Sequence, residues 1–224
     1  MKSEKKILND TLFNEIISTY DNPRHLMHKK MTHVLKYVQQ GEALIDVGCG
    51  IGEFTVRLKD RFHTLVGVDI SQHEIEFAKK RIGSSQSIFF NCGELDSFHF
   101  PDEHFDVCLC LDVLEHVSDL PRLLQETHRI LKRGGSIVVT VPNWYDIIVS
   151  KVLRLNPLHI HTFTPWRWMA ILRKAGFKIR SYRAVDFPLI HSEFLSRKIP
   201  ILGMCILIIA FKYDGLVKSP DLSP

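Results

Sequence analysis

The chain has 224 residues, which is enough for one domain with a complete hydrophobic core. Its 45% hydrophobic and 24% charged residues are typical of a globular protein. The formal net charge of +4 is small, and no basic block is long or interleaved with aromatic residues, so we expect no nucleic-acid partner.

The cysteines and the N-terminus indicate the compartment. Five scattered cysteines without a C-x-x-C pair argue for a reducing compartment and against a zinc site. The charged start Met1–Lys6 is followed by no apolar signal core. The longest apolar run, residues 199–211, contains Pro200 and Gly203 and is too short to span a bilayer. We expect a cytoplasmic protein that holds no metal.

A helical lead is expected over residues 1–40, and after it strands and helices alternate. The expected elements are strand 43–47, helix 53–61, strand 64–68, helix 72–82, strand 87–90, strand 105–111, helix 119–132 and strand 136–141. Ser71 with Glu74 predicts a capping box for the helix that ends at Ile82. The pair Gly134-Gly135 predicts the end of helix 119–132.

The alternation predicts an α/β fold with a parallel, doubly wound sheet through Val141. Thr164 and Pro165 predict the start of a further helix that ends at Gly176, followed by strands at 177–186 and 204–213. We therefore divide the chain into the lead, a domain over 41–214 with insertions at 142–163 and 187–203, and a frayed tail over 215–224.

The most informative segment runs from Asp46 to Glu53 and contains three glycines. Gly48, Gly50 and Gly52 follow a buried apolar strand and remove Cβ atoms where the backbone turns sharply toward a ligand. Asp46 and Glu53 flank the turn, where a pyrophosphate would need bare helix N–H groups. The two carboxylates favour a cationic, phosphate-free nucleoside such as S-adenosylmethionine. The alternative, a dinucleotide, fits less well because Glu53 replaces the third phosphate-loop glycine.

Three further segments follow the next strands and should meet the glycine turn at one edge of the sheet. Asp69 ends the second strand, where its carboxylate would accept hydrogen bonds from both ribose hydroxyls, although a helix-capping role is the alternative. Residues 91–95 follow the third strand and should meet the adenine. Residues 111–116 follow the fourth strand and should face the reacting end.

Together these segments resemble class I S-adenosylmethionine-dependent methyltransferases, and most closely the small-molecule branch that includes ubiquinone-pathway O-methyltransferases. The resemblance covers about residues 41–143 and is weaker at 159–163 and 175–177. The segments that carry it are 46–53, 68–69, 93–95, 105–106, 114–117 and 131–135. It implies a Rossmann-like sheet of seven strands, the last of them antiparallel, with helices on both faces.

The resemblance also implies which residues hold S-adenosylmethionine. Asp46 and the backbone of 48–52 would bind the methionine part, Asp69 the ribose, and Glu94 with Leu95 the adenine. Many members carry Asp where this chain has Glu94. The full set expected to contact the cofactor is Asp46, Gly48, Cys49, Gly50, Gly52, Asp69, Ile70, Gly93, Glu94, Leu95 and Leu111.

Three histidines are candidate catalytic groups. His116 follows the fourth strand and titrates near neutrality, so it is a candidate base, while the alternative is a histidine that only packs or hydrogen-bonds. His159 and His161 alternate at strand spacing and so share a face. They would contact substrate, assist acid–base chemistry or shape a loop. A metal site is not expected here, because no nearby Asp or Glu offers a third ligand at suitable spacing.

The predicted function is transfer of a methyl group to a small, apolar acceptor through oxygen or nitrogen. The apolar content of 142–163 and 187–203 predicts a hydrophobic pocket for that acceptor. A protein or nucleic-acid methyltransferase is one alternative, but 111–114 lacks the Asn/Asp-Pro-Pro-aromatic run of adenine-N6 enzymes. A binding scaffold without catalysis is another. Peripheral membrane contact, and either a monomer or a homodimer, are compatible with the sequence.

Overall fold

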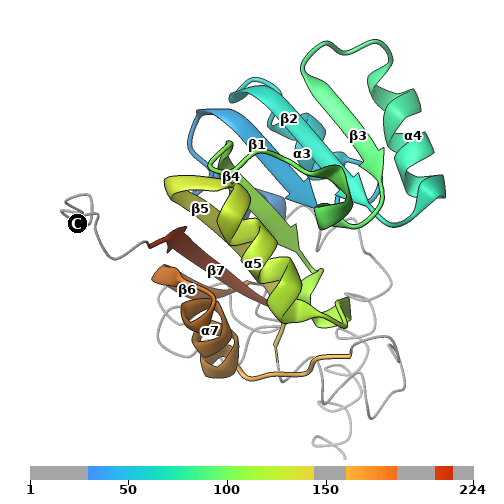
Figure 1. The fold of residues 1–224 in the computed structure, drawn as a ribbon. Helices are drawn as coiled ribbons and strands as arrows, with labels where there is room; N and C mark the ends of the chain where they lie inside the picture. The colour runs from blue at the N-terminus through green and yellow to red at the C-terminus, as the bar shows by residue number, and fades with distance from the viewer. Residues whose placement is uncertain (1–29, 144–159, 186–204, 214–224) are drawn as a thin grey trace, which may run out of the picture.

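A seven-stranded sheet organises the computed structural model, which describes residues 30–143, 160–185 and 205–213 (Figure 1). The strands lie in the order β3-β2-β1-β4-β5-β7-β6, and β7 runs antiparallel to both of its neighbours. Their bounds are β1 Gly41–Val47, β2 Phe62–Asp69, β3 Ile88–Cys92, β4 Phe105–Leu111, β5 Leu131–Pro142, β6 Phe177–Val185 and β7 Cys205–Lys212. The predicted doubly wound, Rossmann-like sheet with an antiparallel last strand is confirmed.

The helices connect these strands and cover both faces of the sheet. Their bounds are α3 Glu53–Arg57, α4 Gln72–Ile82, α5 Leu120–Ile130 and α7 Pro165–Lys174, with short 3₁₀ helices η1 Leu95–Phe98 and η2 Leu114–His116. Strand β1 pairs in parallel with β2 on one side and with β4 on the other. The strand order therefore reverses beside β1, which is where open α/β sheets bind ligands at the carboxyl ends of their strands.

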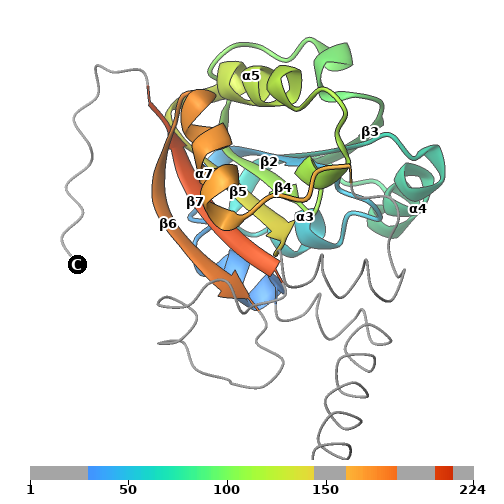
Figure 2. The ribbon, with the colours of Figure 1, turned by 90° about the horizontal axis from the view of Figure 1, so that it is seen from below.

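Alternating apolar residues build a separate hydrophobic cluster on each face. Helices α5 and α7 cover one face, and the helical residues 30–35 with α3 and α4 cover the other (Figure 2). In β1, Ile45 packs toward α5 and α7 while Leu44 packs toward the opposite face. Each fully buried aliphatic side chain of this kind stabilises the fold by about 1.5–3 kcal/mol.

The N-terminal helical segment, residues 30–35, packs directly against the sheet together with the turn that follows it up to Val38. Met31, Val34 and Val38 are buried in the same cluster as Leu44. The Arg61 guanidinium donates hydrogen bonds to the carbonyls of residues 35 and 38, both at 2.7 Å. The predicted insertions and tail lie mostly outside the described residues, so the predicted domain division stays a prediction.

Helix starts follow the predicted caps, with one correction. The Ser71 and Thr164 hydroxyls each accept a hydrogen bond from a backbone N–H three residues on, at 3.4 Å. The capping box at Ser71 is incomplete, because the Ser71 N–H donates to the Asp69 carboxylate at 2.9 Å and not to Glu74. The nearer carboxylate of Asp69 takes this donor, since Asp readily bonds the backbone two residues on.

Gly134-Gly135 lies inside β5, and the prediction that the pair ends a helix is wrong. Helix α5 ends at Ile130, and Leu131 already pairs with Phe105 of β4. The next register pair joins Ser136 to Val107, so the strand bulges across the two glycines. The φ of Gly134, 72°, suits a bulge as well as a helix end, which is why the sequence signal was ambiguous.

Candidate functional site

The glycine turn lies at the carboxyl end of β1, tied to β2. The N–H groups of Gly48 and Cys49 donate to the Val68 carbonyl at 2.8 and 3.1 Å. All three glycines of the turn have positive φ, from 52° to 72°. A Cβ on Gly48 would lie 2.2 Å from Val113, and one on Gly52 would lie 2.3 Å from the Phe90 ring. The turn therefore requires glycine for both conformation and space.

Asp69 connects the glycine turn to the start of α4. Its Oδ2 accepts a hydrogen bond from the Gly50 N–H, and its Oδ1 accepts one from the Ser71 N–H, both at 2.9 Å. The carboxylate is half-buried. Because a carboxylate has about four lone-pair sites, two oxygens with one donor each retain capacity for ribose hydroxyls. The capping role and the ribose role are thus compatible in one side chain.

Asp46 lies beneath the turn and is almost fully buried. Its Oδ2 accepts a hydrogen bond from the Thr55 hydroxyl of α3 at 2.6 Å. Burial is the main cause that raises the Asp46 pKa to about 7, and the nearby Asp69 charge adds to it. Asp46 therefore supports the turn from α3. Its predicted contact with the methionine part of the cofactor stays a prediction.

The raised pKa of Asp46 predicts that stability falls as pH rises. Between the ordinary carboxyl pKa of about 4 and the folded value of about 7, the folded protein holds a proton that the unfolded chain has lost. This contribution is complete below pH 4 and is lost by pH 7 to 8. Urea unfolding at pH 5 and pH 8 measures how much the unfolding free energy falls between these two values. This fall should be smaller in Asp46→Asn than in wild type by about 1–3 kcal/mol. An unchanged drop would contradict the assignment.

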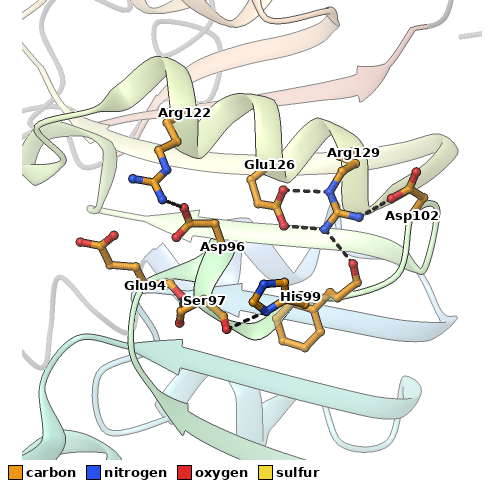
Figure 3. Close-up of polar contacts among 9 residues, drawn as sticks. Glu94, Asp96, Ser97, His99, Asp102, Arg122, Glu126 and Arg129 are labelled. Atoms are coloured by element: carbon orange, nitrogen blue, oxygen red, sulfur yellow. Dashed lines mark hydrogen bonds and ion pairs between the residues drawn. The ribbon is translucent and has the colours of Figure 1, made fainter.

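The loop after β3 is held against α5 by a set of ion pairs (Figure 3). Arg129 bonds both carboxyl oxygens of Glu126, at 2.8 and 2.6 Å, donates to the Phe100 carbonyl at 2.7 Å and pairs with Asp102. Arg122, in the first turn of α5, pairs with Asp96. These contacts fix the loop whose first residues, Glu94 and Leu95, are predicted to meet the adenine.

Arg129→Met is expected to destabilise the protein by about 1–3 kcal/mol, because it leaves the carbonyl and carboxylates that Arg129 joins without their donor. Arg122→Met should change stability by less than about 0.5 kcal/mol, since its ion pair is exposed. Urea unfolding of both variants tests the contrast. If the two variants lose the same unfolding free energy, the contacts of Arg129 contribute no more to stability than the exposed ion pair of Arg122.

The remaining predicted cofactor residues gather at the carboxyl ends of the same strands. The Gly93 N–H donates to the Asp69 carbonyl at 2.8 Å, which joins the third segment to the second. Leu95 is buried in the core, Glu94 is exposed, and Leu111 is half-buried. Ile70 is 78% exposed beside Asp69, an unusual position for an isoleucine unless a ligand covers it.

At the end of β4 a buried lysine meets two acids. Lys30, from the N-terminal helical segment, forms an ion pair with Asp112, whose other oxygen accepts from the Thr140 hydroxyl at 3.0 Å. Asp112 has a φ of 56°, rare for a residue with a side chain, and its N–H donates to the Thr140 carbonyl at 2.9 Å. Glu115 follows and is fully buried, with its pKa raised to about 8, chiefly by burial and then by Asp112.

The three histidine candidates differ in their surroundings. His116 is exposed. His161 is half-buried, its Nε2 lies 2.9 Å from the Val117 carbonyl, and its ring stacks on Phe163. His159 lies outside the described residues. A ring nitrogen that donates to a carbonyl is not available as a base, so the Nε2 contact favours a loop-shaping role for His161. The catalytic roles of all three stay predictions.

The structure brings together the predicted glycine turn, Asp69, the residues after β3 that are predicted to meet the adenine, and the end of β4. All four lie at one edge of the sheet. These residues fit S-adenosylmethionine: a glycine cradle that a Cβ would fill, a ribose-side carboxylate and no basic side chain within the turn. Sequence reasoning missed Thr55, Lys30 and Glu74, whose carboxyl lies against Gly50. Glu115 was within a predicted segment but was not singled out. Across 30–143, 160–185 and 205–213 no group of three His, Cys, Asp or Glu side chains forms a metal site.

Residues 45–139 match the family model described as a methyltransferase domain. The chain is 35% identical over 146 residues to phosphoethanolamine N-methyltransferase 1 of Arabidopsis thaliana, covering 62% of this chain but only 29% of that protein. It is 26% identical over 224 residues to a ubiquinone biosynthesis O-methyltransferase of Coxiella burnetii, covering 89% of this chain and 95% of that one.

Solved structures share the fold at low identity. A putative methyltransferase in complex with the Haloferax volcanii Trm112 methyltransferase activator has a TM-score of 0.69 at 17% identity, with 86% of this chain and 92% of that chain covered. The [4+2]-cyclase SpnF has a TM-score of 0.63 at 22% identity, with 84% and 82% covered. Since one of these neighbours is called a cyclase, the shared fold alone does not establish the reaction.

Proposed function

We propose that this chain, which belongs to the class I S-adenosylmethionine-dependent methyltransferases, transfers the methyl group to an oxygen or nitrogen of a small, largely apolar acceptor. The observation that carries the proposal is the joined site at the carboxyl ends of β1, β2 and β3, where Asp69 bonds the glycine turn and Gly93. The relatives named for O- and N-methyl transfer support a small-molecule acceptor that takes the methyl group on oxygen or nitrogen.

Each part of the site has a separate task in this proposal. S-adenosylmethionine, when bound, supplies a methyl group activated by its sulfonium charge. The glycine turn would hold the methionine part of the cofactor and Asp69 its ribose, and Glu94 with Leu95 would set the position of the adenine. The end of β4 would place the acceptor, and correct placement of two reactants supplies much of the rate in such a transfer. The apolar insertions 142–163 and 187–203 would surround the acceptor's apolar part.

The proposal includes a cytoplasmic location with peripheral membrane contact where the acceptor is a lipid or quinone. All five cysteines are free thiols, in keeping with a reducing compartment. In the described part of the chain no helix is long and apolar enough to cross a membrane. Sedimentation of the purified protein would distinguish monomer from homodimer.

Turnover of methyl-labelled S-adenosylmethionine with a panel of metabolites tests the proposal. We expect label in phenols, quinols or amines that carry alkyl chains, and little in peptides, DNA or RNA. Label only in charged, water-soluble acceptors, without competition from apolar analogues, would contradict the acceptor class. Binding of the cofactor without any transfer would instead support the scaffold alternative.

A further inference from the structure

Glu115 is a buried acid that the site described so far does not use. Its side chain is fully buried, and within the described residues neither carboxyl oxygen has a hydrogen-bond partner. Native proteins pair nearly all buried polar groups, because an unpaired one costs folding free energy. A buried carboxyl group that lacks a hydrogen-bond partner and lies beside a ligand site is a candidate to bond the ligand itself.

Glu115 belongs to the reacting end of the site. It lies in η2, four residues beyond the end of β4. Val113, two residues earlier, touches the glycine turn, since a Cβ on Gly48 would lie 2.2 Å from its Cγ2. The Glu115 carbonyl accepts hydrogen bonds from the N–H groups of Ile160 and His161, at 2.8 and 3.0 Å. Its backbone is therefore fixed between β4 and the segment that precedes α7.

The neighbouring charges distinguish Glu115 from Asp112. Both oxygens of Asp112 have partners, in Lys30 and Thr140, whereas those of Glu115 have none among residues 30–143, 160–185 and 205–213. Lys30 is held in its charged form by Asp112 and lowers the Glu115 pKa, against the larger effects of burial and Asp112. Three other titratable groups of the described residues lie nearby. They are His116, His161 and Cys205, which lies on β7 close to Lys30.

We infer that Glu115 is the general base that takes the proton of a hydroxyl acceptor, an inference that rests on the proposed methyl transfer. The acceptor O–H bond breaks and its proton moves to a Glu115 carboxyl oxygen. The acceptor oxygen forms the new bond to the methyl carbon, and the electron pair of the broken sulfur–carbon bond stays on sulfur. Charge balances, because the sulfonium and the carboxylate are both neutral afterwards.

The chemistry of the acceptor gives this role a measurable signature. A phenol hydroxyl ionises near pH 10, so at neutral pH it needs a base to become a good nucleophile. A nitro group makes the hydroxyl acidic enough to ionise without help. The variant Glu115→Gln keeps the size and polarity of the side chain but cannot take the proton. Its defect should therefore depend on the acidity of the acceptor.

The test compares wild type, Glu115→Gln and the exposed control Glu76→Gln on α4. The acceptors are 4-propylcatechol and 4-propyl-5-nitrocatechol, and calorimetry reports S-adenosylmethionine binding. A readout independent of turnover is the pKa of 4-propylcatechol bound to protein loaded with S-adenosylhomocysteine, followed by the near-ultraviolet difference absorbance of the catecholate. This acceptor ionises above the Glu115 pKa of about 8, so Glu115 is a carboxylate when the acceptor titrates. If the Glu115 carboxylate faces the acceptor, its removal lowers the pKa of the bound acceptor.

We expect Glu115→Gln to bind S-adenosylmethionine as wild type does. Its turnover should fall at least a hundredfold with propylcatechol and less than tenfold with the nitrocatechol, and the bound propylcatechol should have a lower pKa. Equal losses with both acceptors, or losses within threefold, would overturn the role of Glu115 and leave the proposed function standing. Transfer by wild type to amines but to no hydroxyl would also overturn it. Failure of wild type to bind S-adenosylmethionine would overturn the proposed function itself.

Discussion

Asp69→Ala is expected to weaken S-adenosylmethionine binding by at least about a hundredfold, or about 2.7 kcal/mol. In the proposed site the carboxylate would accept two charge-assisted hydrogen bonds from ribose hydroxyls, and bonds to charged groups contribute about 1.5–3 kcal/mol each. It also holds the Gly50 N–H at 2.9 Å, so its removal loosens the turn that would hold the methionine part. Isothermal titration with S-adenosylmethionine measures the loss.

A second variant separates binding from folding. Asp69→Asn keeps the volume of the side chain and one accepting oxygen, so it should bind the cofactor with an affinity between those of wild type and Asp69→Ala. Asp60→Ala, at an exposed position in the turn after α3, is the control and should bind normally. Wild-type affinity in a folded Asp69→Ala protein would refute the ribose assignment.

Gly52→Ala is expected to destabilise the protein by about 2–5 kcal/mol. A side chain at a φ of 72° costs about 1–2 kcal/mol, and the new methyl group would lie 2.3 Å from the ring of Phe90. Phe90 is buried in β3 and also packs against Gly67, so it has little room to move, and overpacking of this kind costs about 1–3 kcal/mol more.

Gly134→Ala is the matched control for this change. Gly134 has the same φ of 72°, but a Cβ there would meet nothing within 4 Å. Its loss in urea unfolding should be about 1–2 kcal/mol, the backbone contribution alone. The difference between the two variants is then the cost of the clash with Phe90. If both variants lose the same free energy, the close approach at Gly52 is not what requires glycine there.

Local patterns carried most of the fold. The apolar run before Asp46, the cap at Thr164 and the alternation of strands and helices each depend on residues close in sequence, and the structure has each feature where it was predicted. Gly134-Gly135 failed because the same backbone freedom serves a helix end and a strand bulge. Only the pairing of Leu131 with Phe105, which is a long-range contact, decides between them.

The reacting end shows the opposite case. Lys30 meets Asp112 across 82 positions of sequence, and no spacing rule indicates such a contact. His116 attracted attention because imidazole titrates near neutrality, yet its neighbour Glu115 is the side chain that turns inward. Which of two adjacent residues faces a site depends on the exact turn after β4, and single residues in a short 3₁₀ helix have no periodicity from which to predict it.

The ion pair between Lys30 and Asp112 shows that the two ends of the proposed site depend on different parts of the chain. The proposed cofactor end is built from β1, β2 and β3, which lie within 52 residues of one another, whereas the end of β4 depends on a side chain that precedes all of them. Substitution of Lys30 would act on Asp112 and the end of β4, whereas the hydrogen bonds that join the glycine turn, Asp69 and Gly93 do not involve Lys30.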